Sequence, residues 1–307
     1  MIQYPAISRE RRLKLLEPPT GPIDMVLDTD TYNEIDDQFA VVYSLLVEQL
    51  NVEAIYAAPF SNANSVGPEN GMELSYEEIL RLLRSVDVDS EGLAFRGSRS
   101  YLPGKGQPVE SPAARDLIAK AKAPRSGPLY VLTIGCITNV ASAILMAPEI
   151  IERIVIVWLG GQPNYWHTAA EFNLQQDVPA AQVVFDCGVP LVHIPCKNVA
   201  EHLRTTVPEM EHYLAGRGAI GDYLLEIFKT HHDDHYAWSK VIWDISSVAW
   251  VLNSDWVPTA LRPSPVLRDD ITWGPVDPAR HLNREATDVS RDAVFRDLFQ
   301  RIETFSR

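Results

Sequence analysis

The sequence predicts a single-domain α/β protein whose mostly parallel, open, Rossmann-like sheet is flanked by helices. Short β-rich runs alternate with longer runs of helical period, which is typical of βαβ units, and Pro and Gly mark the turns between them. The 307 residues are 46% hydrophobic and 22% charged, which fits one large core better than two small ones. We therefore expect one domain over residues 1–307, with a helical C-terminal part.

Each expected element follows from its own residue pattern. Runs rich in Val, Ile and Leu predict strands at 24–29, 52–57, 93–96, 129–134, 154–159 and 189–194. Apolar residues at helical spacing predict helices between them at 35–48, 76–85, 111–123, 138–146 and 178–186. After about residue 197 the same pattern predicts helices at 208–214, 221–229, 240–252 and 291–305, with a strand-like segment at 260–273.

Composition excludes several classes of partner. Lys and Arg number 27 against 41 Asp and Glu, a formal charge of −14, which disfavours a nucleic-acid polymer or an anionic membrane surface. The N-terminus lacks a secretory pattern and no apolar run is long enough to cross a bilayer, so we expect a cytoplasmic protein. Cys136, Cys187 and Cys196 lack metal-site spacing and are expected to be buried thiols.

A dense acidic segment directly follows the first expected strand. Its five carboxylates are Asp28, Asp30, Glu34, Asp36 and Asp37. Helix capping explains one or two acids near a helix start, but crowding five is unfavourable unless a cation or shared protons compensate the charge. The segment contains no Cys or His, so its ligands are hard oxygens that suit Ca²⁺ or Mg²⁺.

Two later segments offer further polar groups. Gly160 and Gly161 follow the strand at 154–159, and the loop after them carries Asn164, Glu171 and Asn173. Such a mixture of donors and acceptors suits vicinal hydroxyl groups, although it is also compatible with an ordinary polar loop. Asp244 lies among apolar residues, where an acid needs a partner, and the same cation is a candidate.

Together these segments resemble the inosine-uridine preferring nucleoside hydrolase family. The resemblance covers most of the chain. Its motifs occur in the family's order: the DTD…DD element at 28–37, then Gly97, Leu102 and Pro103, then Ile137-Thr138-Asn139, then Ala170-Glu171-Phe172-Asn173, and finally Asp244. Any single match would be weak, but the ordered set is a specific signal.

The resemblance implies a calcium-dependent N-ribohydrolase that separates a nucleobase from ribose. Carried over by position, the Ca²⁺ ligands are Asp30, Asp37, Asp244 and the backbone carbonyl of Ile134. The implied ribose-binding residues are Asp36, Asn164, Glu171 and Asn173. Asp30 is also implied as the base that takes a proton from a calcium-bound water. Family members are often dimers or tetramers, which makes a homo-oligomer an expectation by analogy.

Two departures from the family pattern stand out. The loop at 31–35 is two residues longer, and its Tyr32, Asn33 and Glu34 either reach the pocket or only replace a tight turn. Trp243 stands where many members have a histidine that protonates the leaving base. Because indole is no acid near neutral pH, we expect Trp243 to stack on the base, another group to act as donor, or substrates with good leaving groups to be favoured.

The segment 231–236 contains three histidines but matches no standard zinc spacing. It predicts a solvated loop, with a mobile lid that contributes His235 or Tyr236 as a substitute acid as the alternative. Asn62 is a further candidate contact to sugar or base.

Two other functions compete with hydrolysis. One is a calcium-dependent nucleoside or ribose binder that has lost efficient chemistry, because of Trp243 and the longer loop. The other is a phosphatase of the haloacid-dehalogenase type, with Asp28 as nucleophile, Asp30 as acid/base and Mg²⁺ as metal. The second leaves Glu171, Asn173 and Asp244 unexplained and lacks the expected late pair of acids, since Gly221-Asp222 is followed by no acid at short spacing.

Overall fold

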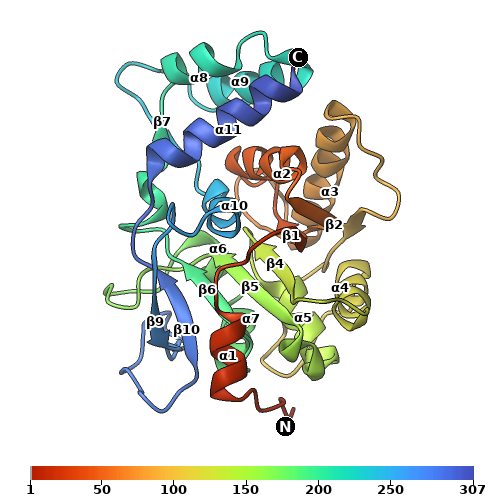
Figure 1. The fold of residues 1–307 in the computed structure, drawn as a ribbon, viewed down its shortest axis with the longest axis vertical. Helices are drawn as coiled ribbons and strands as arrows, with labels where there is room; N and C mark the ends of the chain where they lie inside the picture. The colour runs from red at the N-terminus through yellow and green to blue at the C-terminus, as the bar shows by residue number, and fades with distance from the viewer. Residues whose placement is uncertain (1) are drawn as a thin grey trace.

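The structure is a computed structural model that describes residues 2–307 (Figure 1). Within these residues a sheet of eight strands runs in the order β3-β2-β1-β4-β5-β6-β10-β9. Neighbouring strands are parallel except β10 and β9. The strands are β1 (Ile23–Thr29), β2 (Leu50–Ala57), β3 (Ala94–Arg96), β4 (Leu129–Thr133), β5 (Ile154–Leu159), β6 (Leu191–Ile194), β9 (Thr259–Pro263) and β10 (Leu282–Ala286). The predicted mostly parallel sheet is confirmed.

Helices cover both faces of this sheet. They are α1 (Arg9–Leu15), α2 (Asp36–Leu46), α3 (Pro68–Ser85), α4 (Pro112–Lys122), α5 (Thr138–Met146), α6 (Phe172–Gln176), α7 (Val178–Asp186), α8 (Val207–Leu214), α9 (Gly218–Thr230), α10 (Ile245–Leu252) and α11 (Arg291–Phe305). Short 3₁₀ turns occur at Pro148–Glu152 and Ala200–His202. Helices α8, α9 and α11 gather at one end of the molecule, so the C-terminal part is mainly helical, as predicted (Figure 1).

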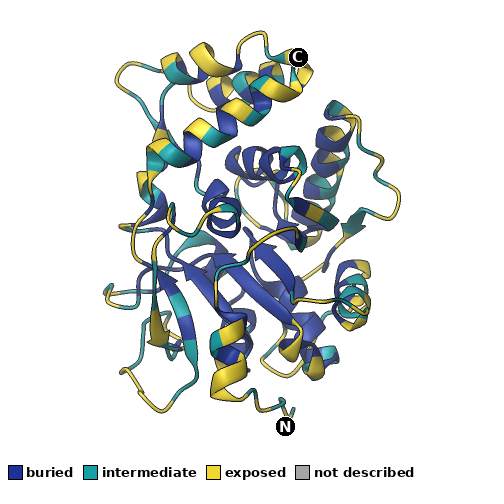
Figure 2. Ribbon diagram, in the orientation of Figure 1, coloured by how far each residue is buried: buried dark blue, intermediate teal, exposed yellow. Residues whose placement is uncertain are grey.

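The strands bury both of their faces, which explains their continuous apolar runs. Alternate residues of β1 enter different cores: Met25 and Leu27 pack with the layer of α2, α3 and α10, whereas Val26 packs with α4, α5 and α7. Figure 2 shows the central strands and the inward sides of these helices as buried. The buried sheet is therefore a rigid scaffold, and the loops at one edge of it can hold functional side chains.

The strand order reverses beside β1. The chain builds β1, β2 and β3 outward in one direction, then returns to place β4, β5 and β6 on the other side of β1. In open α/β sheets the crevice beyond the carboxyl ends of the strands at such a reversal binds ligands. Asp28 and Asp30 lie at this end of β1, and Ile134 directly follows β4. The topology thus brings the predicted acidic segment to the expected binding edge.

The predicted helices at 138–146, 178–186 and 291–305 are found with the predicted bounds. The predicted helix at 240–252 is wrong at its start, because Lys240–Val241 (β8) pairs with Arg204–Thr205 (β7) and α10 begins only at Ile245. The strand-like segment 260–273 ends as a strand at Pro263, because Pro263 and Pro265 lack the N–H that a continuing ladder needs. Strand β10, which sequence reasoning missed, inserts between β6 and β9.

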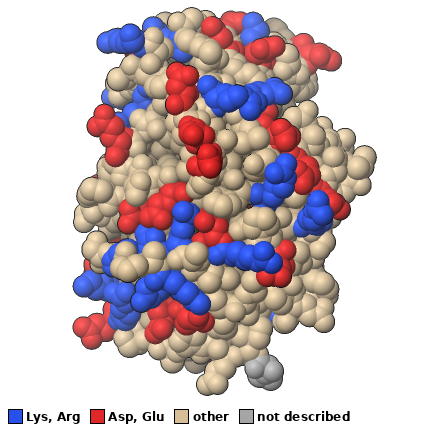
Figure 3. Space-filling model, turned by 90° about the vertical axis from the view of Figure 1, so that its right-hand side faces the viewer, with Lys and Arg blue, Asp and Glu red and all other residues tan. Residues whose placement is uncertain are grey.

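The surface carries charges of both signs. Figure 3 shows one face on which Lys and Arg side chains are interspersed with Asp and Glu. Across residues 2–307, none of the helices combines the length and apolar character required to cross a membrane. That nucleic-acid polymers are not partners stays a prediction from the net charge.

Candidate active site

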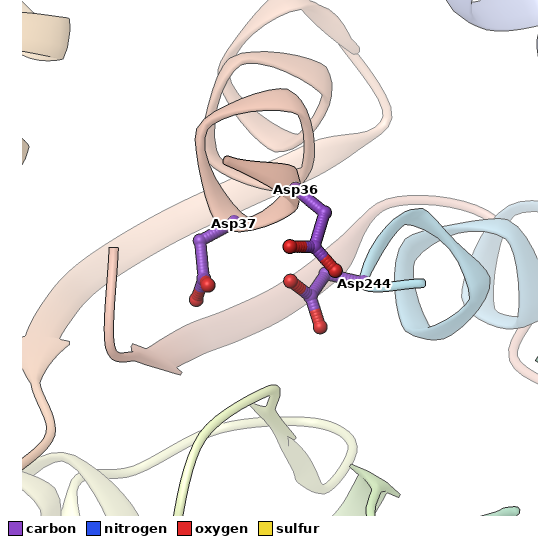
Figure 4. Close-up of side chains that lie close together, drawn as sticks. All are labelled: Asp36, Asp37 and Asp244. Carbon is purple, nitrogen blue, oxygen red and sulfur yellow. The ribbon is translucent and has the colours of Figure 1, made fainter. Parts of the chain in front are cut away.

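Three buried carboxylates converge at the carboxyl edge of the sheet (Figure 4). One oxygen from each of Asp36, Asp37 and Asp244 lies within 4.8 Å of the other two. Asp36 and Asp37 form the first turn of α2, and Asp244 is the N-cap residue of α10. Two helix N-termini therefore meet here, and their positive dipole ends favour the negative charges. The structure thus brings Asp244 to the acidic segment that lies some 200 residues earlier in the chain.

Asp30 lies next to this triad, at the end of β1, and is fully buried. Its backbone N–H donates to Oδ1 of Asp37 at 3.1 Å, and the Thr29 hydroxyl donates to the same oxygen at 2.5 Å. Within residues 2–307, neither carboxylate oxygen of Asp30 accepts a hydrogen bond. A Cβ atom at Gly135 would lie 3.0 Å from this carboxylate, so glycine gives it room. A buried acid without a donor needs a cation or a proton.

The pKa values of these acids follow from burial and mutual repulsion. Burial, followed by the charge of Asp36, raises the pKa of Asp37 to about 7. Burial raises the pKa of Asp30 and of Asp244 well above the ordinary carboxyl range, and the neighbouring carboxylates raise both further. These acids cannot all be ionised near neutral pH without a compensating positive charge. An oxygen-only set of this kind fits a divalent cation such as Ca²⁺ or Mg²⁺.

A cavity of about 530 Å³ opens onto the triad. This volume suits a small molecule. The cavity is lined by Asn33, Glu34, Asp36, Asp37, Asn62, Ile134, Leu159, Gln162, Glu171, Phe172, Asn173, Cys196, Lys197, Trp243 and Asp244. Most site residues expected from the sequence therefore border one space, including Asn62 and Trp243.

Glu171 and Asn173 border the cavity but are largely engaged with the protein itself. The Glu171 carboxylate caps α6 and accepts hydrogen bonds from the backbone N–H groups of Asn173 at 3.1 Å and Gly161 at 2.6 Å. Asn173 Nδ2 donates to the carbonyl oxygens of Ile134 at 2.9 Å and Leu159 at 3.0 Å. These bonds tie the loop after β5 to the strand ends, so both residues shape the floor of the cavity.

Three expected site residues lie outside the cavity lining: Asp30, which is fully buried next to the triad, and also Asn164 and His235. Asn164 sits in the loop after β5, partly buried, with its Oδ1 free of hydrogen bonds within residues 2–307. His235 lies in the loop after α9, where its Nε2 is 2.9 Å from the carbonyl oxygen of Lys229 and its ring lies beside Trp238. The spacing of residues in a long loop does not specify which side chains turn inward, and neither Asn164 nor His235 lines the cavity.

Sequence reasoning missed the cations near the site. Lys240 on β8 pairs with Glu34, and its Nζ lies 3.9 Å from Oδ1 of Asp36. Burial opposes its charge, but Asp36 and Glu34 raise the pKa of the Lys240 ammonium. Lys197 lines the cavity and pairs with Glu201 at 3.1 Å. The sequence around Lys240 gives no signal for its contacts with Glu34 and Asp36. These contacts arise only because β8 packs against the loop at 31–35.

Gly97 packs closely against Asn139, whose side chain binds Asp28. A Cβ atom there would lie 1.9 Å from the Ala57 carbonyl oxygen and 2.5 Å from Nδ2 of Asn139, the side chain that holds Asp28 at 2.8 Å. We expect Gly97→Ala to lower the free energy of unfolding by about 3 kcal/mol, because the backbone must move to relieve the overlap. Urea unfolding measures this loss. Gly127→Ala is the control, since a Cβ atom there meets nothing within 4 Å, and an equal loss in both variants would contradict the argument.

Comparison with known proteins identifies the family of this chain. Residues 25–296 match the family model of inosine-uridine preferring nucleoside hydrolases. The pyrimidine-specific ribonucleoside hydrolase RihA of Salmonella paratyphi A is 29% identical over 266 residues, 78% of this chain and 83% of RihA. The RihA of Escherichia coli O9:H4 is 28% identical over the same shares of each chain.

Two solved structures share the fold. The purine-preferring ribonucleoside hydrolase from Gardnerella vaginalis superposes with a TM-score of 0.74 at 20% identity, over 92% of this chain and 99% of that one. The plant nucleoside hydrolase PpNRh1 gives a TM-score of 0.73 at 19% identity over the same shares. The family match spans the sheet, the acidic segment and Asp244 together. The chain therefore belongs to the inosine-uridine preferring nucleoside hydrolase family, and it is a hydrolase of the N-glycosidic bond of ribonucleosides.

Proposed function

We propose that this chain holds Ca²⁺ at the buried carboxylates and cleaves a ribonucleoside in the cavity above them, releasing free base and ribose. The observation that carries the proposal is the convergence of Asp36, Asp37 and Asp244 beside the partnerless carboxylate of Asp30. Three of these buried acids line one small-molecule cavity and the fourth, Asp30, lies beside them, so their mutual repulsion opposes folding unless a positive charge compensates it.

Asp30, Asp37, Asp244 and the Ile134 carbonyl would hold the cation. All are oxygen donors, as Ca²⁺ requires, and the Ile134 carbonyl keeps a second lone pair beyond the one that accepts from Asn173. When bound, the cation supplies positive charge that makes water more acidic and orients a sugar diol. Carboxylate and carbonyl oxygens suit both Ca²⁺ and Mg²⁺, and we choose Ca²⁺ because the resemblance to the family implies it.

The chain's own residues then perform the chemistry. Asp30 accepts a proton from the attacking water, since its two oxygens accept no other hydrogen bond within residues 2–307. Asp36, held beside Lys240, accepts hydrogen bonds from ribose hydroxyls, and Glu171 and Asn173 keep the floor in place. As the C–N bond stretches, positive charge on the ribose ring is stabilised by the surrounding carboxylates. Trp243 supplies an apolar face for the departing base.

The phosphatase alternative has little support in the geometry. Its nucleophile, Asp28, already accepts a hydrogen bond from Asn139 at 2.8 Å, and the phosphatase mechanism gives no role to Asp244, which lies beside Asp36 and Asp37. A non-catalytic binder would use the same cation and nucleoside site as the hydrolase and would differ from it only in lacking turnover. A cytoplasmic location and a homo-oligomer, dimer or tetramer, stay predictions from sequence.

A panel of ribonucleosides with Ca²⁺, assayed for reducing sugar, tests the proposal. We expect free ribose from at least one purine or pyrimidine ribonucleoside, and no phosphate from a phosphomonoester. Nucleoside-dependent thermal stabilisation without ribose release would favour the binder instead. Phosphate release that persists in purified protein would favour the phosphatase.

A further inference from the structure

The longer loop at 31–35 is fastened against the cavity by several hydrogen bonds. The Thr31 hydroxyl donates to the Ser75 carbonyl at 2.9 Å, and the Asn64 side chain donates to the Asn33 carbonyl at 2.9 Å. At its far end Glu34 pairs with Lys240. The loop thereby presents Asn33 and Glu34 to the cavity, while Tyr32 is exposed outside its lining. An ordered loop of this kind is more than a replacement for a tight turn.

The hydrogen bonds determine which end of the Asn33 amide is already engaged by the protein. The backbone N–H of Asn64 donates to Asn62 Oδ1 at 2.8 Å, and a backbone N–H can only donate. The opposite end of the Asn62 amide is therefore its NH₂ group, which donates to Asn33 Oδ1 at 2.7 Å and to the Asn33 carbonyl at 3.1 Å. Asn33 Oδ1 thus faces Asn62, and Asn33 Nδ2 has no hydrogen-bond partner within residues 2–307.

Asn33 lines the same cavity as Asp36, Asp37 and Asp244. It is 9% exposed, against 4% at Asp36, 3% at Asp244 and 1% at Asp37. The half-buried Trp243 lines the same cavity, three residues after the lysine that pairs with Glu34. A sugar diol bound at Asp36 would leave its base in the same cavity, where Asn33 and Trp243 can contact it.

We propose that Asn33 determines base specificity by donating a hydrogen bond from Nδ2 to an oxo group of the leaving base. This inference rests on the proposed function and goes beyond it. Because Asn33 Oδ1 is engaged, the side chain offers the base a donor and no acceptor, so it favours a carbonyl over an amino group at the contacted position. The bond also withdraws electron density from the departing base, which helps where Trp243 cannot protonate it.

Asn33→Asp tests the proposal. The substituted carboxylate keeps an acceptor for Asn62 but cannot donate to a base. We measure kcat/KM for inosine or uridine, which carry oxo groups, and for 4-nitrophenyl β-ribofuranoside, whose leaving group has no oxo group beside the scissile bond. We expect kcat/KM for the nucleoside to fall about tenfold more than for the nitrophenyl riboside, the loss of about one hydrogen bond.

Asn64→Ala is the matched control, because it loosens the same loop from outside the cavity lining. It should affect both substrates in equal proportion. Equal losses in Asn33→Asp would overturn the role of Asn33, since a change in loop position or added negative charge acts on both ribosides alike. Asn33→Ala, which also lacks a donor, replaces it if thermal unfolding shows that Asn33→Asp is misfolded. A wild-type protein that releases ribose from neither substrate would instead refute the proposed function itself.

Discussion

Asp30→Asn is expected to lower kcat by at least about a thousandfold, with the fold intact, because an amide cannot take the proton of the attacking water. The side chain is fully buried and its carboxylate accepts no hydrogen bond within residues 2–307, so the isosteric amide breaks no existing contact there. Removing one of several repelling charges should leave the calcium-free variant at least as stable as the wild type. Ribose release and thermal unfolding together measure both effects.

Asp24→Asn is the control for this variant. Asp24 belongs to the same strand, β1, but lies near its opposite end, where it contacts Asn51 and Arg125 far from the cavity. Its substitution should leave kcat unchanged. Turnover by Asp30→Asn within about tenfold of the wild type would remove Asp30 as the base, given that general-base catalysis contributes about a hundredfold or more.

Removal of the cation is expected to abolish turnover and to make stability strongly dependent on pH. In the calcium-free protein, burial and the charge of Asp36 raise the pKa of Asp37 to about 7, above its value of about 4 in an unfolded chain. A carboxyl of this kind stabilises the fold fully below the unfolded pKa, and this stabilisation is lost as pH rises through the folded pKa. Chelated protein should therefore lose stability between about pH 4 and about pH 7.

Calcium should reverse this trend, because it binds the ionised carboxylates and competes with protons. At a concentration 100 times its Kd a cation adds about 2.7 kcal/mol of stability, a shift of several degrees in Tm. We expect a larger rise in Tm on adding CaCl₂ to chelated protein at about pH 8 than at about pH 5.5. Asp244→Asn, which removes one ligand, should reduce the rise at about pH 8. The same rise at both pH values would argue against these acids as the ligands.

The sequence specified the central α/β layers because their signals are local. The helix at 138–146 and the strand at 154–159 carry apolar residues at their own period and were predicted with the observed bounds. Strand β10 could not be predicted, since Leu282–Ala286 contains Asn, Arg and Glu among few apolar residues and acquires its state only by pairing with β6 and β9. The early start of α3 at Pro68 was missed because its first turns are polar.

Some features of the candidate site could likewise be predicted from the sequence, and others depend on tertiary packing. Sequence alone placed several acids at one strand end and Asp244 in an apolar segment, and electrostatics then demanded a cation, because like charges do not crowd without one. The convergence of Asp36, Asp37 and Asp244, the contact of Lys240 with Glu34 and the positions of Asn164 and His235 outside the cavity lining were decided only by tertiary packing. The reason is physical: residue type limits what a side chain can bind, but the packing of distant segments determines which side chains meet.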